Sequence, residues 1–170
     1  MKRALVLFTL VTLVVAGISA QGKPHMDKGD SAFFAGIDFG SNFGVAGGYE
    51  LMFHKLSIAE KIPLTFGAAA KAGIDFWPGL EIGVGALANV HFAFTTFSEL
   101  PEWAQKFEVY TGLGIGVAVH NGVGVGLAYG GGVAYQLDKS LAIISDNIQV
   151  SGFIGDKNAN VLMLGVRMKL

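Results

Sequence analysis

Apolar residues occupy every second position over most of the chain beyond residue 30, and this spacing constrains the fold more than any other feature. Between residues 80 and 94 the even positions are all apolar, whereas the odd positions carry mostly glycine and polar or charged residues. Successive side chains of a β-strand point to opposite faces, so this spacing predicts a strand with one apolar face. The same alternation is found in residues 33–39, 43–53, 64–76, 107–119, 123–135 and 162–170.

Residues 140–154 alternate less regularly, and we expect a kink there at Ser145, Asp146 and Asn147. With this segment included, the sequence predicts eight strands. Helices are disfavoured because the chain contains 25 glycines, and each glycine inside a helix costs about 1 kcal/mol relative to alanine. The predicted fold class is therefore all-β.

The second face of these strands consists mostly of Gly and Ala with a few charged residues, which would be an unusual surface to expose to water. Hydrophobic residues make up 52% of the chain and charged residues 15%. In a membrane, the apolar faces would contact lipid and the other faces would fill a closed barrel. A strand of about 13 residues spans roughly 33 Å, enough for an apolar band of about 25 Å. We therefore predict a closed antiparallel up-and-down transmembrane β-barrel; the alternative is a soluble barrel with an apolar lumen.

Short loops separate several of the predicted strands. Residues 40–42, 77–79 and 120–122 each form a loop of three residues that keeps the flanking apolar residues on one face and ends in Gly or Asn. Pairing across residues 77–79 sets Asp75 opposite Glu81. The longer connections, residues 54–63 and 95–105, are expected at the opposite end of the barrel, together with both termini.

The N-terminal residues have the organisation of a secretory signal peptide. Lys2 and Arg3 precede an apolar stretch over residues 4–18, and Ser19 and Ala20 supply small residues for cleavage. An uncleaved anchor is the alternative, although a spanning helix needs about 20 apolar residues. We expect a signal peptide over residues 1–20, an N-terminal extension over residues 21–31 and the barrel over residues 32–170.

Charged side chains on the inward faces are the candidate site. We expect a salt-bridge network that fills the lumen, because unpaired charge is costly there. Asp75 and Glu81 could hold a cation, or could be solvated carboxylates at the rim. His91 and Glu108 could act as a general base, but no positioned nucleophile accompanies them, so no enzyme activity is predicted. The residues of the predicted network are Glu50, Lys71, Asp75, Glu81, His91, Glu108, Arg167 and Lys169.

Three consecutive strands, residues 80–94, 107–119 and 123–135, present mainly Gly and Ala inward. An eight-stranded barrel is just wide enough to be filled by side chains, so a wall of glycine leaves space. This space could be a small lumen open to a solute or an apolar ligand, or it could be occupied by residues 21–31 or by a connecting loop. Flattening of the barrel is the alternative.

Composition excludes several other functions. The formal net charge is −1 and no run of Lys or Arg is present, so nucleic-acid binding is not predicted. Without cysteine there is no disulfide, thiolate metal site or thiol nucleophile. The G-x-G spacings within residues 112–132 lack a following helix, so no dinucleotide cofactor is expected, nor any other.

The strand pattern, the signal peptide and an alternation that runs to the last residue make this chain resemble the small eight-stranded outer-membrane β-barrels of diderm bacteria. The resemblance covers residues 31–170. It implies a lipid bilayer and the barrel-insertion machinery as partners, and the bacterial outer membrane as location. The predicted function is non-enzymatic, either structural or giving slight solute permeability through a narrow lumen. The alternative is a barrel, membrane-bound or lipocalin-like and soluble, that carries a lipid or small apolar ligand.

Overall fold

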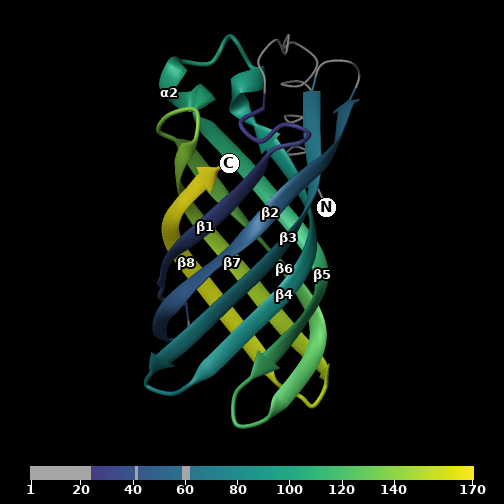
Figure 1. Cartoon of the computed structure of the whole chain (residues 1–170), viewed down its shortest axis with the longest axis vertical. Coiled ribbons are helices and arrows are strands. Elements are labelled where there is room, and N and C mark those ends of the chain that lie inside the picture. Colours follow the sequence, from purple (N-terminus) through teal and green to yellow (C-terminus); the bar gives the residue numbers. More distant parts are fainter. Residues whose placement is uncertain (1–23, 41, 59–61) are drawn as a thin grey trace, which may run out of the picture.

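The computed structural model describes residues 24–40, 42–58 and 62–170, which form an antiparallel β-barrel (Figure 1). The expected signal peptide lies outside the described residues. Each strand pairs with its neighbour in the chain, and β8 pairs with β1, so the barrel is closed. The strands are β1 (Ser31–Asp38), β2 (Phe43–Ile58), β3 (Ile62–Trp77), β4 (Glu81–Ala93), β5 (Phe107–Val119), β6 (Val123–Gln136), β7 (Leu141–Ile154) and β8 (Asn158–Lys169).

The predicted all-β fold with eight strands is confirmed, and so is the register at the short loops. Asp75 pairs with Glu81, and Val119 pairs with Val123. Asp38 pairs with Gly44 at the first turn. Because side chains alternate along a strand, these registers fix which residues face the lumen.

The two ends of the barrel differ. The turn end carries the short connections between β1 and β2, β3 and β4, β5 and β6, and β7 and β8 (Figure 1). The loop end carries the start of β1, the end of β8 and a longer connection with the short helices η1 (Phe94–Thr96) and α2 (Glu102–Gln105). The predicted connection over residues 54–63 is wrong in length, because β2 and β3 stay paired out to Ile58 and Ile62.

Apolar side chains cover the outer face of the barrel. Leu113 and Ile115 are 60% and 67% exposed, whereas Lys71 and Arg167 are 4% and 3% exposed. The predicted sidedness of β5, β3 and β8 is therefore confirmed, and a surface of this kind is suited to lipid. Among the described residues, no helix is long and apolar enough to cross a membrane.

Strand β7 differs from its prediction. The expected kink at residues 145–147 is absent, and β7 is a continuous strand paired to β6 and β8. Its sidedness is reversed: Ile144, Ile148 and Val150 are buried in the lumen, together with Asp146. The outward positions of the same stretch carry Ser, Asn and Gln. The alternation is irregular because Asp146 interrupts the apolar inward face, while Ile143 and Phe153 are apolar residues on the otherwise polar outward face.

The glycine wall of β4 and β5 faces these bulky side chains across the lumen. A Cβ atom placed on Gly85 would lie 2.5 Å from Ile148 Cδ1, and one on Gly116 would lie 2.8 Å from Val150 Cγ2. Leu87 and Val161 complete this apolar core. The space that the sequence predicted at the glycine wall is therefore filled by side chains from β7 and β8, and neither residues 24–31 nor a described loop fills it. Residues 21–23 of the expected plug lie outside the described residues.

Candidate functional site

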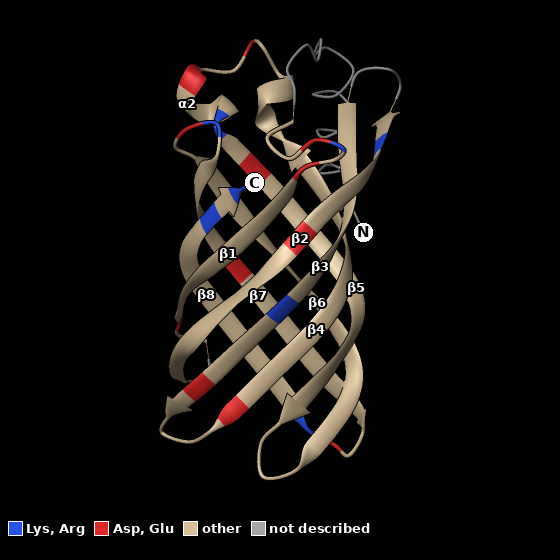
Figure 2. Cartoon of the chain, viewed as in Figure 1, with Lys and Arg blue, Asp and Glu red and all other residues tan. Residues whose placement is uncertain are grey.

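Charged residues occur at several heights along the strands of the barrel (Figure 2), and most of those on inward positions are buried in the lumen. The level nearest the loop end is a buried four-residue cluster of Arg167, Glu108, Glu50 and His91. Arg167 Nη1 donates to Glu108 Oε1 at 2.7 Å and lies 3.4 Å from Glu50 Oε1. The His91 ring lies between the two carboxylates, with Nδ1 2.9 Å from Glu108 Oε1 and Nε2 3.3 Å from Glu50 Oε2. Strands β2, β4, β5 and β8 are thus joined through the lumen.

A single ion pair forms the next level. Lys71 Nζ donates to both carboxylate oxygens of Asp146, at 2.7 and 2.8 Å. The ammonium also lies over the rings of Tyr110 and Phe34, 5.2 and 5.7 Å from their centroids. Tyr110 stacks on His91 with a centroid distance of 4.9 Å and connects this level with the four-residue cluster. The sequence did not predict Asp146 as a site residue, because Asp146 lies on β7, where the face that meets the lumen is the opposite of the one expected from the other strands.

Three inward carboxylates line the turn end. Asp38 and Asp75 both pair in register with Gly44, and Asp75 pairs with Glu81. Strand β1 ends at Asp38, so the first residues of β8 have no strand on that side. Asp38 Oδ1 accepts the Leu162 N–H at 2.9 Å, and Glu81 Oε1 accepts the Asn160 N–H at 3.2 Å. These two carboxylates therefore replace missing strand partners, as buried backbone donors require.

The carboxylates at the turn end are not arranged around a common point. Within the part of the chain that the structure describes, no group of three or more His, Cys, Asp or Glu side chains is arranged to hold a metal ion. Asp75 and Glu81 lie opposite each other as predicted, but Glu81 already serves the open edge of β8.

Residues 24–30, here the mouth segment, cover the loop end. Met26 is buried against the inward side chains of Ala32 and Met52. The Gly29 N–H donates to Met52 O, and the Met52 N–H donates to Asp30 O, both at 2.8 Å. The Lys169 ammonium donates to Asp30 Oδ2 at 3.0 Å and to His25 O at 3.3 Å. Lys169 therefore anchors the mouth segment and is not part of the inner network.

The His25 ring is packed at this mouth, with Nε2 3.1 Å from Gln105 O. Burial lowers the pKa of His25 below its ordinary value; the carboxylate of Glu108 opposes this, and the charges of Arg167 and Lys169 add to it. The docked segment therefore binds a proton less readily than the released segment. As the pH falls below the ordinary pKa of about 6.5, protonation favours release.

This linkage predicts a pH-dependent cleavage after the exposed Lys28. Relative to the His25→Gln variant at the same pH, wild-type cleavage by trypsin should rise about two- to fivefold between pH 8 and pH 5.5. Mass spectrometry of the released peptide measures both rates. A ratio that stays constant over this range would show that His25 does not control docking.

The four-residue cluster has little access for a substrate. Glu108 is fully buried, and His91 is 2% exposed. Both carboxylates already hold the guanidinium of Arg167 and the imidazole. A general base must reach the proton that it removes, and these groups reach only one another. The geometry therefore favours a structural role for the pair of His91 and Glu108.

The closed ring of eight antiparallel strands, with apolar residues outside and charged residues inside, defines a β-barrel of the transmembrane type. The sequence matches no protein-family model and no curated protein. Among solved structures, a de novo designed transmembrane β-barrel is similar, with a TM-score of 0.51 and 13% identity over 89% of this chain and 99% of that one.

Two natural proteins also align. Ail, the attachment invasion locus protein of Yersinia pestis, gives a TM-score of 0.49 and 15% identity over 84% of this chain and 99% of its own. Neisserial surface protein A gives a TM-score of 0.49 and 13% identity over 83% of this chain and 96% of its own. Similarity at this level of identity concerns the fold alone.

Proposed function

We propose that this chain is a non-enzymatic barrel of the bacterial outer membrane with a structural role, and that its lumen does not conduct. The observation that carries the proposal is the filling of the lumen. Four layers follow one another from the loop end toward the turn end. They are the mouth segment, the four-residue cluster, the pair of Lys71 and Asp146, and the apolar core. A hydrated ion would have to displace buried ion pairs and packed side chains.

The alternatives of slight permeability and ligand carriage need internal space. The cavity between Lys71, Asp146 and the neighbouring strands has a volume of about 10 Å³. This is room for about one water molecule. A lipid or small apolar ligand requires some hundreds of Å³, so the filled lumen favours the structural role.

The location is part of the same proposal. An apolar outer face calls for a bilayer, and the n-region, apolar stretch and small residues of positions 2–20 support export through a cleaved signal peptide. Insertion would then depend on the barrel-insertion machinery. Membrane fractionation should recover the folded protein with the outer membrane, extracted only by detergent and with heat-modifiable gel mobility. Recovery as a detergent-independent soluble protein would contradict the location.

Planar-bilayer recording tests the closed lumen. We expect wild-type protein to give no conductance above background, and a variant lacking residues 24–30 to give none either, because the inner levels remain. An outer-membrane porin measured in the same bilayer is the positive control. Steps in the wild-type current would support the permeable alternative, and steps seen only after removal of residues 24–30 would show that the mouth segment alone closes the barrel.

A further inference from the structure

The outer face of β6–β8 carries a patch of uncharged polar side chains within an otherwise apolar surface. We call it the polar outer patch. Four of its members alternate along β7, two lie on β8 and one on β6, and register pairs them across the strands. The patch consists of Ser145, Asn147, Gln149, Ser151, Asn158, Asn160 and Tyr129.

The patch lies at membrane depth. Ser145 pairs with Leu164 on one side and with Val133 on the other, and these two side chains are 51% and 41% exposed. Along β7 itself the patch lies between Ile143 and Phe153, which are 43% and 67% exposed. Apolar side chains therefore flank the patch at both of its ends along β7 and on both sides of Ser145, while Ser151 and Asn158 form the last pair before the β7–β8 turn.

Hydrocarbon leaves these groups without partners. Asn147 Oδ1 accepts the Gly131 N–H and Asn158 Oδ1 accepts the Gly152 N–H, both at 3.0 Å, so two groups of the patch are satisfied within the barrel. Lipid tails offer no hydrogen bonds, and a polar group without one is costly in that environment. Within the described residues, no hydrogen bond is made by the side chains of Ser145, Gln149, Ser151 and Asn160.

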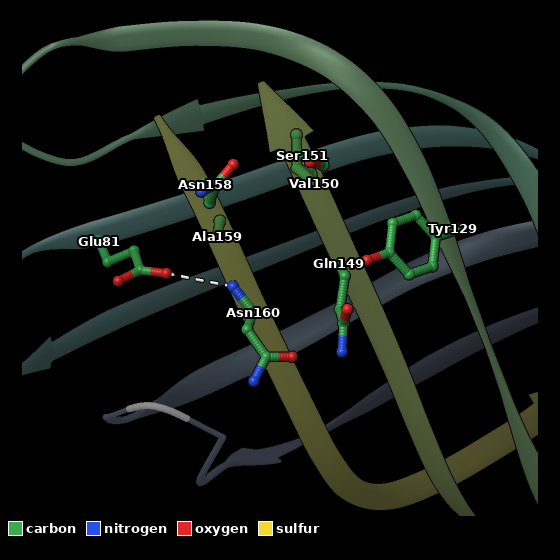
Figure 3. A pocket seen from close by; sticks show the side chains of 8 residues that line it. All are labelled: Glu81, Tyr129, Gln149, Val150, Ser151, Asn158, Ala159 and Asn160. Carbon is green, nitrogen blue, oxygen red and sulfur yellow. Dashed lines mark hydrogen bonds between the residues drawn. The ribbon is translucent and has the colours of Figure 1, made fainter. Parts of the chain in front are cut away.

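The surface beside these side chains is hollowed. A depression of about 430 Å³ is lined by Tyr129, Gln149 and Asn160 of the patch and also by Glu81, whose carboxylate already accepts the Asn160 N–H. Figure 3 shows the amide groups of Gln149 and Asn160 projecting to the same side of β7 and β8, with the hydroxyl of Tyr129 turned toward Gln149. The depression gives room for side chains from another molecule to reach these polar groups.

A second copy of the same chain fits this surface. Two copies insert in the same direction, so a twofold axis that relates them must be parallel to the membrane normal. Such an axis brings residues of equal height together, and patch therefore meets patch. Carboxamide and hydroxyl groups both donate and accept hydrogen bonds, and the patch carries no charge that would repel its copy. The surface is thus complementary to itself.

We propose that the chain forms a twofold dimer in the membrane, with the polar outer patch of one copy against that of the other. Polar contacts between transmembrane helices act by the same principle, since each gives a polar group the hydrogen bond that lipid cannot provide. The proposal depends on the barrel lying in a bilayer and is independent of whether the lumen conducts.

Disulfide cross-linking in lipid vesicles tests the proposal, because the chain has no cysteine of its own. Asn147→Cys places a thiol in the patch. Val84→Cys is the matched control. Its neighbour Gly85 faces Ile148 of β7 across the lumen, so Val84 lies on the opposite wall, and its side chain points outward with 44% exposure. Under mild oxidation at high lipid-to-protein ratio, most Asn147→Cys chains should become linked dimers, whereas Val84→Cys should stay at the level of random collision. Ser151→Cys should behave as Asn147→Cys and serves if that variant fails to fold.

Particle mass provides a second readout. In mild detergent, the double variant Asn147→Leu with Gln149→Leu should halve the protein mass measured by light scattering, while heat-modifiable mobility confirms that it remains folded. Equal cross-linking of patch and control thiols, or a monomeric wild-type mass, would overturn the proposal. Either outcome would assign the patch to a lipid headgroup or to another protein. Failure of the wild-type chain to enter vesicles would instead count against the membrane location.

Discussion

Replacing Arg167 with methionine is expected to lower the free energy of unfolding by about 3–5 kcal/mol. Arg167 is 3% exposed, and its guanidinium lies between Glu50 and Glu108, which are themselves buried. Its removal leaves two carboxylates in the lumen with only His91 beside them. An uncompensated buried charge cannot be solvated at this depth, so the loss should far exceed that of a surface ion pair. Denaturant unfolding of the vesicle-bound protein, followed by heat-modifiable mobility, measures the effect.

Two comparisons test whether the loss comes from the buried charge. Met168→Leu, at the next position on the outer face, should change the unfolding free energy by no more than about 0.5 kcal/mol. Adding Glu50→Gln and Glu108→Gln to Arg167→Met should recover part of the loss, because the carboxylates no longer need a cation. If Arg167→Met alone stays within about 1 kcal/mol of wild type, the four-residue cluster does not stabilise the barrel.

The strand set and most of the sidedness could be predicted because both are local properties of the sequence. Alternation from Leu80 to Phe94 fixes one strand by itself, and a three-residue loop such as residues 120–122 fixes the register of its two neighbours. The position of Asp75 opposite Glu81 followed from such a loop. The reversed sidedness of β7 was missed because no residue near its outward polar positions indicates which face of the strand meets the lumen.

The pairing of charges across the lumen could not be predicted in the same way. Lys71 and Asp146 lie on β3 and β7, which are not neighbours in the sheet, and their contact depends on the width of the barrel. Sequence reasoning placed Lys71 in the lumen and expected a partner without identifying it. A search for an acidic residue among the buried apolar positions of the irregular strand would have found Asp146.

The same reversal explains why the glycine wall leaves no open lumen. Ile148 extends from β7 toward Gly85, and Val161 from β8 toward Gly73, so bulky side chains on one wall face glycine on the other. The two walls can approach only because one of them lacks side chains. Side chains from the opposite wall therefore fill the lumen beside the glycines.

This complementarity gives the second large expected effect. Ile148→Ala should lower the free energy of unfolding by about 2–5 kcal/mol, since it removes buried methyl groups and leaves a cavity. Gly85→Ala should cost about 1–3 kcal/mol by itself, because its Cβ would meet Ile148 Cδ1 and Ala128 Cβ at 2.5 and 3.0 Å. In the double variant the new methyl group enters the space that Ile148 vacates. The combined loss should then fall short of the sum by about 1 kcal/mol or more.

A matched substitution separates packing from the general effect of replacing glycine. Gly79 lies in the turn between β3 and β4, and a Cβ placed there meets no atom within 4 Å. Gly79→Ala should therefore change the unfolding free energy by at most about 0.5 kcal/mol, and its effect should simply add to that of Ile148→Ala. If the loss of each glycine variant simply adds to that of Ile148→Ala, Ile148 does not press on Gly85. The lumen would then contain free space beside the glycine wall.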